Sequence, residues 1–270
     1  MGKRRKKGER REGTCAYCLK EGPITVDHVF PQTIFLVLDE QMVTVPACDE
    51  CQRVKSLGDA DLRNFITLDI AGSQHPDALV HAERIATGNV RRRNWLLRVL
   101  AEAEEVALVT EAGLRVGTGL EFPFNMDRIL KAQEMTIRGL HFYETKQMLP
   151  VSCPIYVERV PWSIAPAFLI EFSARHPFTP TVKGKDIAWW KSFPLEGEPA
   201  DSRAWFVCYN NAVLFSSSTG TAAVAERALR EEQRKAGERE KIFEGLVTRV
   251  GPREVRVPRG RDGEILLPPS

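Results

Sequence analysis

The sequence has no apolar run near the ~18 residues that a membrane-spanning helix requires. Its basic beginning is followed by no apolar stretch, so it lacks the pattern of a secretory signal. Gly2 lacks the serine or threonine of a myristoylation signal, because Lys6 occupies that position. The formal net charge is only +2, so overall charge does not indicate a nucleic-acid partner. Together these absences predict a cytoplasmic protein with no membrane association.

Cysteine is scarce, with six residues in 270. Four of them form two Cys-x-x-Cys pairs, which are Cys15 with Cys18 and Cys48 with Cys51. Two such pairs suit a tetrahedral structural Zn²⁺ that ties two distant segments together, and they fit a reducing compartment better than a disulfide framework. Cys153 and Cys208 lie in apolar, strand-like segments, where we expect buried thiols.

Between the two pairs lies the run Val26-Asp27-His28-Val29-Phe30-Pro31. A site with four thiolates needs neither Asp27 nor His28, because four ligands already complete its tetrahedron. Aspartate is a natural ligand for hard ions such as Mg²⁺ or Mn²⁺. Histidine, with an ordinary pKa of ~6.5, is mostly neutral in the cytoplasm and can accept a proton. The pair therefore indicates a second, catalytic metal and a general base.

Residues 14–60 resemble the zinc-containing HNH endonucleases, whose active site has the ββα-metal fold. The run from Asp27 to Gln32 is similar to that family's Asp-His-hydrophobic-x-Pro signature. The second pair, followed by Lys55-Ser56, resembles the family's Cys-x-x-Cys-Asn-x-x-Lys helix start. The resemblance implies hydrolysis of DNA phosphodiester bonds, with Asp27 on a catalytic Mg²⁺ or Mn²⁺ and His28 as base. It also implies products with a 5′-phosphate and a 3′-hydroxyl.

One position departs from the family pattern, because Gln52 stands where the family has asparagine. Glutamine carries the same amide oxygen on a stem one methylene longer. Either it reaches the metal or the ion is displaced, and displacement would slow in-line chemistry by orders of magnitude. The acidic residues nearby offer alternative ligands, and spacing does not choose among them: Asp49, Glu50 and Asp59.

Basic residues around the motif suggest contacts with nucleic acid. The family match favours a phosphate-contacting or charge-stabilising role for Lys55, whereas Arg53 is equally explained by a backbone contact or a solvated helix face. Lys3, Arg4 and Arg5 belong to a segment that we expect to be disordered. A solvated tail and a cationic arm for phosphate backbones both explain it, and the adjacent nuclease motif favours the arm. Arg91-Arg92-Arg93 and Trp189-Trp190 also resemble nucleic-acid contacts, although a wet surface and core aromatics explain them more simply.

The whole chain reads as an α+β protein with five segments. Residues 1–13 form the arm and residues 14–60 the zinc and nuclease module. Residues 61–150 are helix-rich with one β-hairpin, including a helix capped by Asn125. Residues 151–250 are strand-rich, with a hairpin turning at Asn210-Asn211 and a terminal helix, and residues 251–270 form a loose tail.

Three functions remain open at this point. The first is a metal-dependent DNA endonuclease, encoded by a phage or used in defence against phages. The second is a zinc-stabilised nucleic-acid-binding protein whose catalytic site has decayed at Gln52. The third is a nuclease subunit that awaits a protein partner, and a homodimer is an alternative assembly. The same chemistry serves RNA, so RNA is an alternative substrate in each case.

Overall fold

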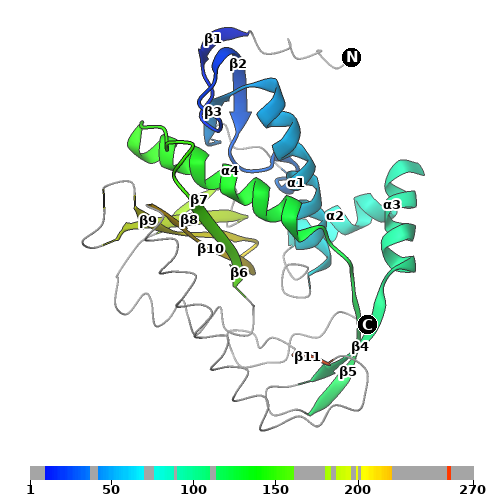
Figure 1. Cartoon of the computed structure of the whole chain (residues 1–270). Helices are drawn as coiled ribbons and strands as arrows, with labels where there is room; N and C mark the ends of the chain where they lie inside the picture. Colours follow the sequence, from blue (N-terminus) through cyan, green and yellow to red (C-terminus); the bar gives the residue numbers. More distant parts are fainter. Residues whose placement is uncertain are drawn as a thin grey trace.

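The computed structural model describes residues 10–36, 42–69, 76–87, 90–109, 114–160, 180–183, 187–195, 199, 202–220 and 254–256. Within these residues the fold is mixed α+β, which confirms the predicted class. A three-stranded sheet lies at the amino-terminal end, helices follow it, and a five-stranded antiparallel sheet is built from later segments (Figure 1).

The amino-terminal sheet is built around strand β2 (Glu21–His28). Strands β1 (Arg11–Thr14) and β3 (Thr44–Ala47) pair with it in antiparallel fashion, one on each side. The predicted disordered arm over residues 1–13 is therefore wrong at its end, because residues 11–13 belong to β1 and gain backbone hydrogen bonds from β2. Residues 1–9, with Lys3, Arg4 and Arg5, lie outside the described residues.

Helix α1 (Asp49–Leu68) begins directly after Cys48. Its buried face includes Leu62, Phe65 and Ile66, so the apolar pattern that holds the helix in place continues well past the second cysteine pair. The predicted module boundary at residue 60 thus falls inside a continuous helix. A short 3₁₀ helix, η1 (Gln32–Ile34), lies between β2 and β3.

The middle of the chain contains two helices and a β-hairpin. Helices α2 (Pro76–Ala86) and α3 (Val90–Ala101) are followed by β4 (Glu104–Val109) and β5 (Arg115–Glu121), as the sequence predicts. A short strand near the carboxyl end, β11 (Glu254–Arg256), pairs in parallel with β4.

Helix α4 (Met126–Thr145) is the central element of the fold. Asn125 caps it as predicted, because its Oδ1 accepts a hydrogen bond of 3.0 Å from the backbone nitrogen of Arg128. Helix α1 crosses it closely at Gly58, where a Cβ atom would lie 2.3 Å from the carbonyl oxygen of Arg128. Only glycine therefore permits this approach of the two helices.

The five-stranded sheet has the order β6-β10-β9-β8-β7 and is antiparallel throughout. Its strands are β6 (Ile155–Val160), β7 (Thr181–Lys183), β8 (Ala188–Pro194), β9 (Arg203–Tyr209) and β10 (Val213–Thr219). The predicted hairpin is confirmed, since Asn210 and Asn211 have φ values of 51° and 53° between β9 and β10. Asparagine tolerates this left-handed region better than most residues.

Helix α4 lies between the amino-terminal unit and the five-stranded sheet (Figure 1). One hydrophobic core includes residues of the cysteine unit, α1, α4 and the sheet. Phe30, two residues after His28, stacks against Trp190 of β8 with ring centroids 5.4 Å apart. The amino-terminal unit and the sheet are thus packed as one body rather than as separate modules.

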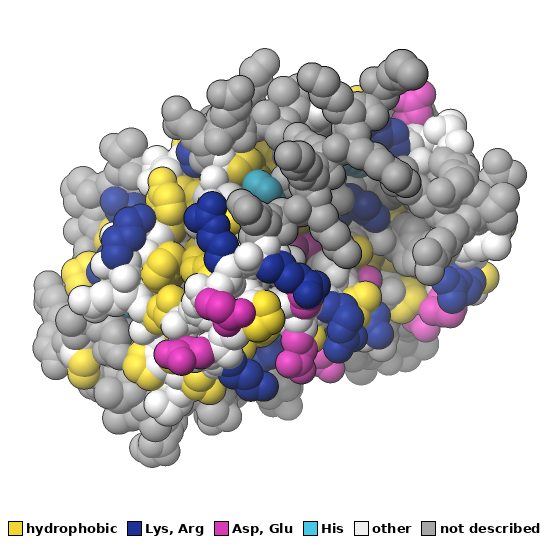
Figure 2. All heavy atoms as spheres, turned by 90° about the horizontal axis from the view of Figure 1, so that it is seen from above, with side chains coloured by type: hydrophobic (Ala, Val, Ile, Leu, Met, Phe, Trp, Pro, Cys, Tyr) yellow, Lys and Arg dark blue, Asp and Glu magenta, His cyan; other side chains and the backbone are white. Residues whose placement is uncertain are grey.

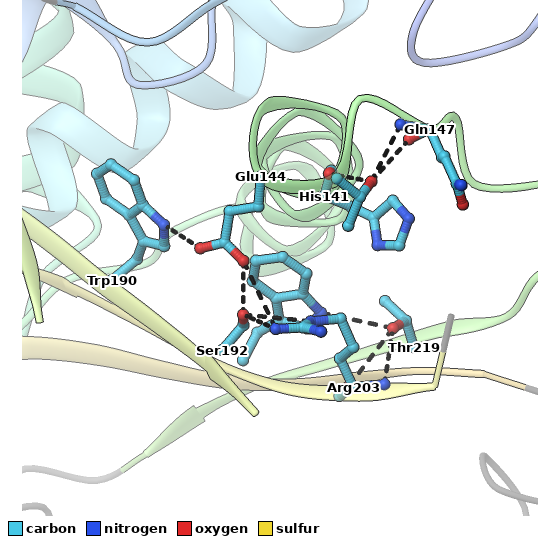
Figure 3. Close-up of polar contacts among 9 residues, drawn as sticks. His141, Glu144, Gln147, Trp190, Ser192, Arg203 and Thr219 are labelled. Atoms are coloured by element: carbon cyan, nitrogen blue, oxygen red, sulfur yellow. Dashed lines mark hydrogen bonds and ion pairs between the residues drawn. The ribbon is translucent and has the colours of Figure 1, made fainter. Parts of the chain in front are cut away.

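The carboxyl-terminal end of α4 is fastened to the sheet by Glu144. Its Oε1 accepts a hydrogen bond of 2.9 Å from Trp190 Nε1, and its Oε2 accepts one of 2.6 Å from Ser192 Oγ. Arg203 Nη2 in turn donates to Ser192 Oγ at 2.6 Å. Figure 3 shows Glu144 reaching from the helix toward these strand residues. Because each polar group has partners, we interpret the cluster as a structural clamp.

The predicted terminal helix of the 151–250 segment lies outside the described residues, as does most of the predicted tail. Cys153 and Cys208 are buried, as predicted. None of the described helices is long and apolar enough to cross a membrane.

Candidate metal and catalytic site

The four paired cysteines converge in the amino-terminal unit, as their spacing predicts. The Sγ atoms of Cys15, Cys18, Cys48 and Cys51 all lie within 4.8 Å of one another, and those of Cys18 and Cys48 are 3.9 Å apart. A tetrahedron with Zn–S bonds of 2.3 Å requires sulfur–sulfur distances of about 3.8 Å. The cluster therefore fits a structural Zn²⁺, with small inward shifts for the longer distances.

Backbone contacts bring the first cysteine pair against the second. The turn after Cys15 is closed by the nitrogen of Leu19, which donates to the Cys15 carbonyl at 2.9 Å, and Leu19 itself has a φ of 61°. The nitrogen of Ala16 donates to the carbonyl of Pro46 in β3 at 2.8 Å. Because β3 leads directly into Cys48, this bond sets the two pairs side by side.

Bringing four sulfur atoms together changes the pKa values of their thiols. Burial, followed by the nearby Cys15 thiolate, raises the pKa of Cys51, and burial also raises the pKa of Cys18. Binding of a divalent cation reverses this effect, because a coordinating thiol loses its proton to the metal. Metal binding and folding of this unit should therefore be coupled.

Asp27 and His28 lie at the end of β2, and both are half-buried. Because successive residues of a strand face opposite sides, their side chains leave β2 in opposite directions. Asp27 Oδ2 accepts a hydrogen bond of 2.8 Å from the hydroxyl of Tyr17, which lies between the first two cysteines. Burial and the Asp27 carboxylate raise the pKa of Tyr17, so the tyrosine keeps its proton and acts as the donor. The hydrogen bond engages Oδ2 and not the other carboxylate oxygen, Oδ1.

His28 lies on the face of β2 that also carries Val26, whose side chain is 69% exposed. The Nε2 atom of its ring is 2.8 Å from Nε2 of Gln32, in η1. An amide nitrogen can only donate, so in this arrangement the histidine nitrogen is the acceptor. Gln32 thus orients the imidazole.

Gln52 lies on the inner side of the sheet, near the face that carries Asp27. Its amide nitrogen donates to Oγ1 of Thr25 and, at 3.2 Å, to the carbonyl oxygen of Ala47. Thr25 and Asp27 are two residues apart on β2 and so share a face. The amide nitrogen binds Gln52 to the sheet, and only its carbonyl oxygen is available as a metal ligand.

Lys55 is buried, with 1% of its surface exposed, rather than presented to solvent. Its ammonium donates to the backbone carbonyl of His28 at 3.1 Å and to Oδ2 of Asp59 at 2.7 Å. Burial raises the pKa of Asp59 to about 6, against the lowering effect of Lys55. Lys55 therefore supports the backbone at His28 and does not reach the surface, which the predicted contact with a phosphate would require.

Of the other predicted ligands, Asp59 pairs with Lys55 and lies close enough to Asp27 for that carboxylate to contribute to its raised pKa, whereas Asp49 and Glu50 pair with basic residues. Asp49 forms an ion pair of 2.6 Å with Arg10, and Glu50 lies 4.0 Å from Lys20, both at the surface. Within the part of the chain that the structure describes, the four cysteines are the one cluster of three or more potential metal-binding side chains. Asp27 and Gln52 carry oxygen donors, the type that Mg²⁺ and Mn²⁺ prefer, and such ions usually keep several waters and take further ligands from substrate phosphates.

Only some of the residues predicted to contact nucleic acid belong to the described part of the chain. Arg53 is exposed on α1, whereas Trp190 is buried and Trp189 is half-buried and bonded to Asn211. The side chains of Arg91, Arg92 and Arg93 lie outside the described residues. Figure 2, seen from above, shows basic side chains interspersed with acidic and hydrophobic ones rather than gathered in one stripe.

Sequence reasoning did not assign roles to Tyr17 and Gln32, which hold Asp27 and His28. In the sequence, the only signal for Tyr17 is its position between two cysteines. The only signal for Gln32 is its position four residues after His28. The Lys55–Asp59 pair did have a local signal, because residues four apart face each other on a helix.

No family model, no curated protein and no solved structure matches this chain. The structure itself contains a four-cysteine cluster, consistent with a zinc site, in a mixed α+β fold.

Proposed function

We propose that this chain is a metal-dependent endonuclease that hydrolyses DNA phosphodiester bonds. The observation that carries the proposal is the placement of half-buried Asp27 and His28 at the end of β2, in a unit where β2, β3 and α1 follow one another beside four clustered cysteines. A strand–strand–helix unit with this pair is what the resemblance to HNH endonucleases implies.

In this proposal the protein residues divide the work of hydrolysis. Asp27, with the carbonyl oxygen of Gln52, holds Mg²⁺ or Mn²⁺, which supplies positive charge beside the scissile phosphate. His28 takes a proton from water as the water oxygen bonds to phosphorus. The bond from phosphorus to the 3′ oxygen breaks, and that oxygen gains a proton from solvent. The products carry a 5′-phosphate and a 3′-hydroxyl.

Two residues that contact His28, Gln32 and Lys55, have defined roles in this mechanism. Gln32 occupies His28 Nε2, so the attacking water must displace it when substrate binds. Catalytic hydrogen bonds often form only in the substrate complex, so this arrangement is compatible with a resting state. Lys55 fixes the carbonyl of His28 and thereby the direction in which the imidazole leaves the strand.

The alternative is a zinc-stabilised protein that binds nucleic acid without cutting it. One observation favours this alternative, because both amide hydrogens of Gln52 are used within the sheet. A ligand held in this way adjusts less readily to a metal than the shorter asparagine of the family pattern. The two functions make opposite predictions for cleavage and the same prediction for binding.

The test is plasmid cleavage by zinc-loaded protein with Mg²⁺ or Mn²⁺, compared with His28→Ala. Loss of a general base typically lowers the rate by about 10²–10⁴-fold, so nicking should nearly vanish. His81→Ala is a matched control, because it removes a histidine of α2 that has no part in the proposed chemistry. Equal cleavage by native protein and His28→Ala would refute the proposed base. DNA binding without cleavage by native protein would support the binding function or a nuclease that awaits a partner.

A further inference from the structure

The side chain of Tyr17 joins the cysteine cluster to the catalytic carboxylate. Tyr17 belongs to the first pair, between Cys15 and Cys18, yet its hydroxyl donates to Oδ2 of Asp27 at 2.8 Å. The two residues come from different segments, and their hydrogen bond joins the turn of the first cysteine pair to the end of β2. One group therefore contacts both the metal-type cluster and the candidate active site.

The tyrosine ring is fixed from several sides. Only 5% of Tyr17 is exposed. The turn that carries it is bound to β3 through the nitrogen of Ala16 and the carbonyl of Pro46. On the other side the ring packs on α4, where a Cβ atom on Gly139 would lie 3.5 Å from Tyr17 Cε1. A hydroxyl held this rigidly can determine how its partner is oriented.

We infer that Tyr17 is a positioning residue that orients the Asp27 carboxylate for a catalytic divalent cation and makes this orientation depend on the folded four-cysteine cluster. The inference rests on the proposed function. A carboxylate has two oxygens, and a hydrogen bond to Oδ2 directs Oδ1 to a single place. Outer partners of metal ligands act in this way, and their loss typically weakens metal affinity or activity by about 10–100-fold.

The consequence is a dependence of one metal site on the other. Without an ion among the cysteines the turn carrying Tyr17 loses one of its anchors, because the pair on either side of the tyrosine is no longer held. Tyr17 then holds Asp27 less firmly, although neither Asp27 nor His28 has changed. Zinc would thus support catalysis through geometry while taking no part in the chemistry.

The experiment measures Mn²⁺ binding to the full-length, zinc-loaded protein by electron paramagnetic resonance, without DNA. Tyr17→Phe keeps the ring and its packing but removes the hydroxyl, so we expect zinc content to be unchanged and the Mn²⁺ dissociation constant to rise by about 10-fold. Asp27→Asn should weaken binding at least as much. Tyr143→Phe is the matched control, because Tyr143 lies on the exposed side of α4.

A double variant decides whether Tyr17 acts through Asp27. In an Asp27→Asn background, Tyr17→Phe should have little further effect on Mn²⁺ binding, because both partners of the hydrogen bond are then altered. An equal loss in both backgrounds would overturn the inference, even if Tyr17→Phe alone disturbed the fold. Native affinity in Tyr17→Phe with weak binding in Asp27→Asn would overturn it while leaving the proposed function intact. Mn²⁺ binding insensitive to Asp27→Asn would refute the proposed metal site and this inference together.

Discussion

The ammonium of Lys55 lies 3.1 Å from the backbone carbonyl oxygen of His28, in a position from which water is almost fully excluded. The same ammonium is 2.7 Å from Asp59, one helical turn further along α1. A buried charge is tolerated only when paired and hydrogen-bonded, and Lys55 meets both conditions. This relationship makes α1 a support for the end of β2 and leads to the first two predictions.

Replacing Lys55 with methionine should destabilise the protein strongly. The change leaves Asp59 buried without its counter-ion, and removing one partner of a buried pair typically costs about 3–5 kcal/mol. Urea unfolding of the zinc-loaded protein measures this loss. Lys131→Met is the control, because the Lys131–Glu134 pair is exposed and should contribute at most about 1 kcal/mol. The double variant Lys55→Met/Asp59→Asn should recover part of the loss, and strict additivity would argue against the buried pair.

Stability should depend on pH through Asp59. Burial raises the pKa of this carboxyl from 3.8 to about 6, so between these values the folded state holds a proton that the unfolded state releases. Its contribution to stability is therefore present at low pH and is lost as pH rises through 6. Between about pH 5 and 7.5, the unfolding free energy of native protein should fall about 1 kcal/mol more than that of Asp59→Asn. Parallel curves for the two proteins would mean that Asp59 titrates normally.

Removing one cysteine of the cluster should abolish zinc binding and unfold the amino-terminal unit. We expect native protein to contain about one zinc ion per chain and Cys48→Ser to contain almost none, because a structural site needs all four ligands. Zinc analysis and thermal melting measure the two effects. Cys153→Ala is the control, since this buried thiol lies outside the cluster and should leave zinc content unchanged. Full zinc content in Cys48→Ser would exclude the four-cysteine site.

Gly58→Ala should separate α1 from α4. The added Cβ would lie 2.3 Å from the carbonyl oxygen of Arg128 and 2.6 Å from the Cβ of Ala132, and backbone cannot give way as a flexible side chain does. Overpacking of this kind typically costs about 1–3 kcal/mol, which chemical unfolding would detect. Gly117→Ala tests the same substitution where nothing lies within 4 Å, and it should be nearly neutral. Equal effects at both positions would contradict a close helix crossing.

Gln52→Asn should separate the structural role of this residue from its role in catalysis. The shorter amide loses at least one of the contacts to Thr25 and Ala47, which should lower stability by about 1 kcal/mol. Cleavage should be unchanged or faster, because asparagine is the residue of the family pattern. Plasmid nicking at several Mg²⁺ concentrations provides the measurement. Abolished cleavage in a zinc-loaded variant would show that the comparison with the family is wrong at this position.

Local patterns in the sequence were sufficient for much of the fold. The spacing of the cysteines predicted a cluster that the structure assembles, and Asn125 and Asn210-Asn211 predicted a helix cap and a hairpin turn that both occur. These features depend on residues that are close along the chain, or on a chemistry that few residue types share. The strand at residues 11–14 was missed because its sequence carries no apolar alternation. Backbone pairing with β2 holds this strand in place, although its sequence lacks an apolar pattern.

The sequence by itself therefore determined the mixed α+β class, the cysteine cluster and the presence of Asp27-His28 at a strand end. Only the tertiary structure decided what surrounds that pair: the Tyr17 hydroxyl on Asp27, the buried Lys55 behind His28, and the amide of Gln52 bound to the sheet. Each of these contacts joins residues from different elements. Their geometry follows from how α1 and α4 pack on the sheets, and that packing depends on shape complementarity between distant segments rather than on any local pattern.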